Sequence, residues 1–483
     1  MIDLLLCSLP AIEIYLPPHA PAALKGHLGG FNFTTKTLDL NMLMYHTVSN
    51  DVFNNLNSYF TNQTFTITDD ICDDHEIVMN TWTGAIAKEK FKWLGISVFS
   101  IDSRKAALDL CARYKDRDFK IVAGGMGMGN GSFGQELLDA GLIDAYVVGE
   151  GEHALVSLLQ GNTDYPGIFT KDGGRTAEQI LDLDALGFAD YTDYNLTQYT
   201  GFYNEPVVQV TGSRGCVRNC TFCDIADMWP KFKFRSGDNI AEEIINTYEQ
   251  HGIRNFYFTD SLINGSMKAY MKMCETLANY NATHNAGLRW GGQYIVRTAK
   301  ECPSDYFSLT AASGAFNLAM GVETGSDSVR THMRKKFLNK DLDFTMENFA
   351  KHRITCSYLI IIGYPTETEH DFHETLRMFK RHQKYAAQGI ILGVTLGATM
   401  SALDNTPIHN TMVGDITLQH QSFPTSWVLK SNPELDYATR VRRRLEAEVV
   451  CDYLGYNLIS SDRNFSNILR EYTNFTNVLK TTS

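Results

Sequence analysis

Three closely spaced cysteines are the residues of this chain whose type and spacing could do chemistry. Cys216, Cys220 and Cys223 lie in the stretch GSRGCVRNCTFCDI, residues 212–225, and follow the pattern CxxxCxxC. Thiolates bind zinc, iron and other soft metal centres. The other seven cysteines stand singly, most simply as buried thiols of a protein in a reducing compartment. The three-cysteine loop therefore predicts a metal centre.

The number of cysteines bears on which metal centre this is. A structural zinc site usually has four Cys or His ligands in two close pairs, and this sequence has no second CxxC-like pair. A disulfide would leave one cysteine over. A 4Fe-4S cluster held by three thiolates keeps one iron open, and that iron could bind S-adenosylmethionine (SAM) and pass it one electron. The spacing favours such a cluster, with zinc or coincidence as alternatives.

The first third of the chain alternates apolar runs with helical stretches. Continuous apolar runs are typical of buried parallel strands, and they occur at residues 2–9, 35–42, 93–100, 120–125 and 145–149. This pattern predicts a doubly wound, Rossmann-like α/β sheet with a ligand crevice at the carboxyl ends of its strands. Glycines stand at those ends, in GGMGMGNG (124–131) and GEGE (149–152). They either form tight turns or let a nucleotide-like ligand approach the backbone.

A second alternating series follows. Its apolar runs lie at residues 206–211, 255–260, 288–296, 316–322, 356–363 and 390–397. Six strand–helix units cannot close an eight-stranded barrel, so we expect a partial (β/α)6 TIM-like barrel with the cysteine loop at its functional end. We therefore interpret residues 1–165 as the first domain, 166–200 as a linker, 201–410 as the partial barrel and 411–483 as a helical C-terminal region.

Charge and composition narrow the possible partners. The net charge of −12 argues against a broad nucleic-acid surface. Two basic clusters, residues 330–336 and 440–444, fit solvated helix faces, and Val449 is expected on the buried face of the last helix. The first basic residue is Lys25, so the N-terminal apolar run lacks the charge of a signal peptide and is too short for a membrane span. We expect a cytoplasmic protein.

Several stretches resemble the radical SAM superfamily, and more closely its branch with a cobalamin-binding-type domain before the radical SAM barrel. The CxxxCxxC loop follows the first barrel strand and has an aromatic residue, Phe222, before its last cysteine. Further similar stretches are GVETGSDSVRTHMRK (321–335), IIGYPTETEHDFHETL (361–376) and DAYVVGEGEHALVSLL (144–159). The resemblance covers roughly residues 1–400.

The resemblance implies roles for individual residues. The three cysteines would ligate a 4Fe-4S cluster, and SAM would meet Asp260 at its amino end, Glu323 at its ribose and methionine part, and Gly363 along its adenine. Asp260 and Glu323 could instead cap helices, and Gly363 could form a turn. In the first domain, the candidate cofactor-binding residues are Gly124, Gly125, Gly149 and Glu150.

The sequence departs from the family pattern at two places. TDSLIN follows the second barrel strand where the family has Gly-Gly-Glu. The Asp-x-His-x-x-Gly element that gives many cobalamin proteins an imidazole ligand is absent, and DDHEIV (73–78) comes nearest to it. Cobalamin therefore remains an expectation that rests on the resemblance of the whole domain, and the alternative is a retained domain that has lost this cofactor or binds substrate.

These features predict a radical SAM enzyme. It would form a 5'-deoxyadenosyl radical, abstract hydrogen from an unidentified substrate and, with cobalamin, transfer a methyl group. No catalytic residue is assigned, and a flavodoxin or ferredoxin would supply electrons. One alternative is a methylthiotransferase, whose second cluster would need Cys7, Cys72 and Cys111. Another is a non-catalytic, metal-binding scaffold.

Overall fold

The computed structural model of the chain describes residues 1–10, 13–61, 69–129, 131–199, 201, 205–397, 406–412, 414–418 and 426–459. The chain divides into two compact units, residues 1–210 with 242–256 and residues 211–241 with 257–483. None of the described helices is both long and apolar enough to span a lipid bilayer.

The first unit is built on a seven-stranded sheet in the order β2-β1-β3-β4-β5-β6-β7. Its parallel strands are β1 (Ile2–Ser8), β2 (Thr35–Asp39), β3 (Phe91–Ser97), β4 (Lys120–Gly124) and β5 (Ala145–Val147). They coincide with the five predicted runs. Two short antiparallel strands, β6 (Ile168–Thr170) and β7 (Gly173–Gly174), extend the sheet into the segment predicted as a linker.

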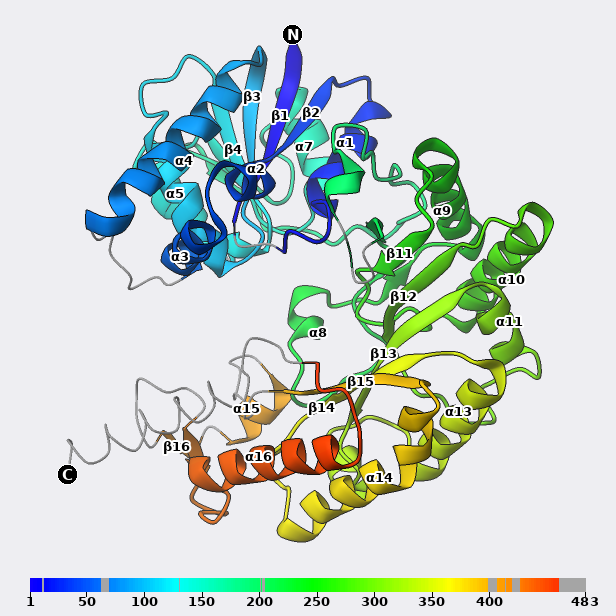
Figure 1. Cartoon of the computed structure of the whole chain (residues 1–483). Helices are drawn as coiled ribbons and strands as arrows, with labels where there is room; N and C mark the ends of the chain where they lie inside the picture. The colour runs from blue at the N-terminus through cyan, green and yellow to red at the C-terminus, as the bar shows by residue number, and fades with distance from the viewer. Residues whose placement is uncertain are drawn as a thin grey trace. The chain divides into compact units, whose positions relative to one another are not determined.

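Both faces of this sheet are buried, as a doubly wound fold requires. Within β1, Leu5 and Cys7 join one apolar cluster, and Leu4 and Leu6 join the other. Residues of five helices pack in the first cluster, and residues of α1 (His19–Gly29) and α7 (Gly151–Leu159) in the second (Figure 1). The five are α2 (Leu40–Thr47), α3 (Asn50–Thr61), α4 (Asp69–Ala87), α5 (Arg104–Ala112) and α6 (Ser132–Asp139). The predicted fold class of the first domain is confirmed.

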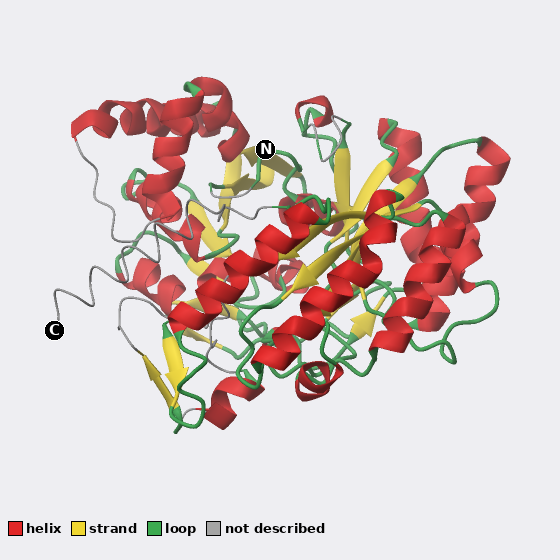
Figure 2. Cartoon of the chain, turned by 60° about the horizontal axis from the view of Figure 1, so that its bottom comes forward, coloured by secondary structure: helices red, strands yellow, loops and turns green. Residues whose placement is uncertain are grey.

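The second sheet has six strands in the order β15-β14-β13-β12-β11-β8. The strands are β8 (Val207–Val210), β11 (Asn255–Phe258), β12 (Arg289–Tyr294), β13 (Ala315–Glu323), β14 (Cys356–Ile360) and β15 (Ile391–Leu396). The connections contain α9 (Gly237–His251), α10 (Met267–His284), α11 (Tyr306–Ala312), α13 (Asn339–His352) and α14 (Glu369–Ala387). Helices α10, α11, α13 and α14 lie along one side of the strands (Figure 1), and Figure 2 shows the chain from another side with helices and strands in different colours. All six predicted strands are present, and the partial barrel is confirmed.

The C-terminal region contains α15 (Pro407–Met412), the antiparallel strands β16 (Ile416–Leu418) and β17 (Trp427–Leu429), and α16 (Tyr437–Tyr453). Residues 460–483 lie outside the described residues. The predicted orientation of α16 is right only in part: Val441 is buried and Arg442 is exposed, but Arg440, Arg443 and Arg444 are buried and Val449 is 61% exposed. Arg440 donates to the carbonyl oxygen of Trp427 in β17, whereas Arg443 and Arg444 donate to a carboxylate and a carbonyl group of the barrel, and these hydrogen bonds override the apolar periodicity of the helix.

Candidate metal centre

The cysteine loop leaves the end of β8 and ends at the short helix α8 (Ile225–Met228). An antiparallel pair, β9 (Ser213–Arg214) with β10 (Lys233–Phe234), closes the loop at its base. Gly215 follows β9 with φ of +83°, and a Cβ there would lie 2.9 Å from the carbonyl oxygen of Lys231. Glycine is therefore required for the chain to turn into the first cysteine.

The three thiols of Cys216, Cys220 and Cys223 are half-buried. Burial raises the pKa of each, to about 11 for Cys220, and neighbouring thiols of the same loop raise the pKa values of Cys220 and Cys223 further. The Sγ of Cys216 accepts a hydrogen bond of 3.3 Å from the backbone N–H of Arg218. The three thiols therefore lie in one shared electrostatic environment, where a bound cation would favour their thiolate forms.

The number of thiols in the loop matches a 4Fe-4S cluster with one open iron. Within the described part of the chain, no three His, Cys, Asp or Glu side chains converge as the ligands of one ion do. A 4Fe-4S cluster differs, because each thiolate binds a different iron. Three half-buried thiols distributed along one loop are suited to that group.

Asp260, two residues beyond β11, holds the start of the cysteine loop. Its carboxylate accepts hydrogen bonds from the Gly212 N–H at 2.8 Å and from the Ser213 hydroxyl at 2.5 Å. The side chain is buried, and burial raises its pKa to about 7. The capping alternative is wrong, because Ser266 caps the following helix, α10. The predicted contact of Asp260 with SAM stays a prediction.

The raised pKa of Asp260 predicts how stability depends on pH. A carboxyl group whose folded-state pKa is about 7 and whose ordinary pKa is 3.8 stabilises the fold most below pH 3.8. This contribution, up to about 4 kcal/mol, is lost as pH rises through 7. Asp260→Asn removes this titrating group. In urea unfolding of the metal-free protein between pH 5.5 and 8.5, the free energy of unfolding of the variant should therefore rise relative to that of wild type as pH rises. Parallel profiles would contradict this.

Glu323, at the end of β13, sits in a strained and buried position. Its backbone φ is +64°, and its carboxylate pairs with the ammonium of Lys335 at 2.8 Å. Such strain in a non-glycine residue concentrates at functional sites. Glu323 does not cap a helix, because Ser326 caps α12 (Asp327–His332). Sequence reasoning missed Lys335, which it grouped with a solvated basic cluster.

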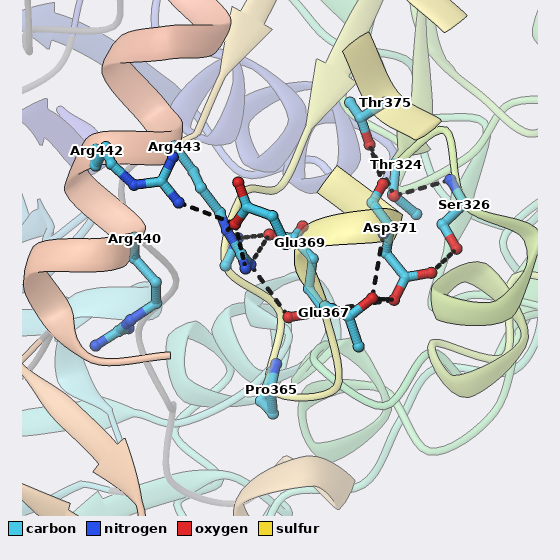
Figure 3. Close-up of polar contacts among 12 residues, drawn as sticks. Thr324, Ser326, Pro365, Glu367, Glu369, Asp371, Thr375, Arg440, Arg442 and Arg443 are labelled. Atoms are coloured by element: carbon cyan, nitrogen blue, oxygen red, sulfur yellow. Dashed lines mark hydrogen bonds and ion pairs between the residues drawn. The ribbon is translucent and has the colours of Figure 1, made fainter. Parts of the chain in front are cut away.

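The segment after β14 contains Gly363, the predicted adenine contact. The Gly363 N–H donates to Glu367 Oε1 at 3.2 Å, and Glu367 is buried against Arg443, whose Nη1 donates to the same oxygen at 2.9 Å (Figure 3). A Cβ at Gly363 would lie 2.5 Å from the side chain of Arg440. Helix α16 thus fixes the backbone of this segment, and its role toward SAM stays a prediction.

The segments after β13 and β14 are also joined to each other. The Ser326 hydroxyl donates to Asp371 at 2.6 Å, and the hydroxyls of Thr324 and Thr375 lie 3.1 Å apart (Figure 3). Asp371 and Thr375 belong to α14. The two stretches predicted to meet SAM are therefore anchored on the same helix.

In the first unit, the four predicted cofactor residues gather at one edge of the sheet. Gly124 ends β4, Gly149 and Glu150 follow β5, and these two strands are parallel neighbours. The Glu150 carboxylate accepts a hydrogen bond from the backbone N–H of Ile180, and Gly125 leads into a short 3-10 turn. Their cofactor role stays a prediction.

The residues of the two alternative sites are not assembled. Cys7 and Cys111 are buried in the apolar core, and Cys72 is exposed on α4. His75 also lies on α4, not after a strand, and its Nε2 is 3.0 Å from an Asp109 oxygen. The structure therefore gives no support to a second cluster of Cys7, Cys72 and Cys111, or to an axial imidazole from DDHEIV.

The fold and the loop define a class of protein: a doubly wound α/β unit, followed by a partial barrel with three cysteines after its first strand. The sequence of residues 210–379 matches the Radical SAM superfamily. The match covers this region of the chain, and the fold of the chain is similar to that of a radical SAM methyltransferase solved with cobalamin bound.

Three comparisons illustrate this. The chain is 27% identical over 182 residues to cytidylyl-2-hydroxyethylphosphonate methyltransferase of Streptomyces wedmorensis. This match covers 35% of this chain and 32% of that protein. It is 23% identical over 245 residues to anaerobic magnesium-protoporphyrin IX monomethyl ester cyclase of Synechocystis, and this match covers 49% of this chain and 48% of that protein. The match thus spans half or less of these curated relatives.

The third comparison is a solved structure. The radical SAM methyltransferase TsrM from Kitasatospora setae, with cobalamin and a [4Fe-4S] cluster bound, has a TM-score of 0.69 at 14% identity. The similarity covers 96% of this chain and 92% of TsrM. At this identity the likeness concerns the fold.

Proposed function

We propose that the chain is a radical SAM enzyme that holds a 4Fe-4S cluster through Cys216, Cys220 and Cys223 and cleaves SAM reductively to start hydrogen abstraction. The observation that carries this proposal is the half-buried three-thiol loop after β8, within the region that matches the superfamily. When bound, the cluster supplies the electron that breaks a carbon–sulfur bond of SAM.

The protein's own residues would bind and orient the cofactors. Asp260 fixes the start of the cysteine loop through Gly212 and Ser213, and the loop end is tied to the barrel through Thr221. Glu323 ends β13 and Gly363 lies in the segment after β14, and we expect SAM to lie at these two strand ends. Placing ligand contacts on strand ends gives the site a rigid base.

We further propose that the first unit binds cobalamin and that the enzyme transfers a methyl group to an unidentified substrate. The shared fold with TsrM over both units supports this, as does the gathering of Gly124, Gly149 and Glu150 at one sheet edge. Because His75 packs against Asp109, cobalamin would bind without a ligand from DDHEIV. A flavodoxin or ferredoxin would donate electrons.

Anaerobic reconstitution tests the proposal. Protein loaded with iron and sulfide is incubated with dithionite and SAM, with and without hydroxocobalamin, and 5'-deoxyadenosine and S-adenosylhomocysteine are measured by chromatography. Deoxyadenosine in both samples, with S-adenosylhomocysteine only when cobalamin is bound, supports radical methyl transfer. Deoxyadenosine alone supports a cyclisation, rearrangement or oxidation instead. Neither product, despite full iron content, would contradict the proposed function.

A further inference from the structure

Lys335 lies beside the cysteine loop, although its sequence context suggested a solvated cation. Its ammonium is 5.9 Å from the ring centroid of Phe222, which stands between Cys220 and Cys223. Next to Phe222, the Thr221 N–H donates to the carbonyl oxygen of Met333 at 3.2 Å. The segment that carries Lys335 is therefore attached directly to the cysteine loop.

The backbone around Lys335 is strained. Arg334 and Lys336, on either side of it, have φ of +60° and +59°, and its partner Glu323 has φ of +64°. Each such conformation costs a non-glycine residue about 1 kcal/mol or more, and it persists only where the surrounding structure imposes it. Three of them surround one buried ion pair. The surrounding structure therefore imposes the backbone conformation on both sides of Lys335, and the ion pair with Glu323 holds its ammonium.

The buried ion pair of Lys335 and Glu323 lies beside the cysteine loop, because the Lys335 ammonium is 5.9 Å from the ring centroid of Phe222. The side chains of Lys335 and Glu323 are 11% and 9% exposed, so water screens this charge poorly.

We propose that Lys335 is the cation that offsets the negative charge of the three thiolates and raises the reduction potential of the cluster they hold. This inference rests on the proposed function. Each electron added to a thiolate-bound cluster makes it more negative, so a nearby buried cation stabilises the reduced form more than the oxidised form. Glu323 then has two effects: it positions Lys335 and moderates its charge. Lys335 is thus a positioning and electrostatic residue, not a catalytic one.

The test is a redox titration of reconstituted protein without SAM, followed by electron paramagnetic resonance. Lys335→Met should lower the midpoint potential of the cluster. At the wild-type midpoint, the ratio of reduced to oxidised cluster should fall about tenfold or more, and a tenfold fall corresponds to a shift of about 59 mV for one electron. Lys335→Arg keeps the positive charge, so its midpoint potential should stay close to that of wild type. Lys336→Met removes an exposed charge at the adjacent position and should change little. Glu323→Gln should move the potential in the opposite direction.

The outcomes separate this inference from the proposed function. If wild type binds no cluster, the proposed function fails. If wild type binds a cluster and cleaves SAM but Lys335→Met and Glu323→Gln leave the potential unchanged or shift it the same way, only the inference about Lys335 fails. If Lys335→Met does not retain iron, the inference is tested by Glu323→Gln alone. A raised midpoint potential in that variant supports the inference, because loss of structure does not raise a potential selectively, and an unchanged or lowered potential contradicts it.

Discussion

Replacing Cys223 with alanine is expected to abolish both the cluster and SAM cleavage. Three half-buried thiols in one loop leave no spare ligand, so two thiolates would have to hold four irons. We expect iron content and the brown absorbance to fall to background. Formation of 5'-deoxyadenosine should fall by more than ~100-fold, the upper end of what losing an outer-shell partner costs a metal site.

The chain offers a matched control for this experiment. Cys302 is also half-buried and belongs to the same unit, but it stands alone. Cys302→Ala should therefore keep full iron content and deoxyadenosine formation. Equal losses in both variants would mean that general damage, not ligand removal, explains the result. An active Cys223→Ala protein with normal iron would contradict the three-thiolate site.

The second large effect concerns Arg443, which enters the barrel from α16. Its guanidinium pairs with the buried carboxylate of Glu367 at 2.9 Å, with 5% and 0% of the two side chains exposed. Removing one partner of a buried ion pair costs about 3–5 kcal/mol, because the other charge is left without compensation. Arg443→Met should lower the free energy of unfolding, measured with urea, by that amount, and increase hydrogen exchange in α16.

Neighbouring residues make this prediction specific. Arg442→Met is the control, since Arg442 is half exposed and pairs with exposed carboxylates, so the loss should stay below about 1 kcal/mol. Burial already raises the pKa of Glu367 to about 7, and removal of the cation raises it further. The free energy of unfolding that Arg443→Met loses relative to wild type should therefore be smaller at low pH, where Glu367 is protonated. A pH-independent loss would contradict this explanation.

Much of the fold could be predicted from local patterns. Each of the eleven apolar runs that predicted a strand overlaps a strand in the structure, because a parallel sheet covered on both faces requires apolar side chains at successive positions. The strands β6 and β7 were not predicted, since their short segments around Phe169 and Gly174 carry no such run. Antiparallel strands this short are specified by the turn that joins them.

The orientation of α16 could not be predicted for a related reason. Apolar spacing assigns Val449 to the buried face, whereas the helix buries Arg440, Arg443 and Arg444 and leaves Val449 exposed. A buried arginine is stable only with acceptors at the right distance, and those acceptors come from distant parts of the chain, such as Glu367 and the carbonyl group of Leu396. Sequence spacing carries no information about them.

The amino-acid sequence alone is sufficient to predict the ligands of the candidate metal centre. CxxxCxxC defines three thiols that must lie in one loop, because their separation along the chain is short. The residues that surround these thiols become visible only in the folded chain. Asp260 holds the start of the loop, and Lys335 reaches it from a segment more than a hundred residues away. Covalent connectivity fixes near neighbours, whereas the charges that tune a metal centre are brought together by the packing of distant strand ends.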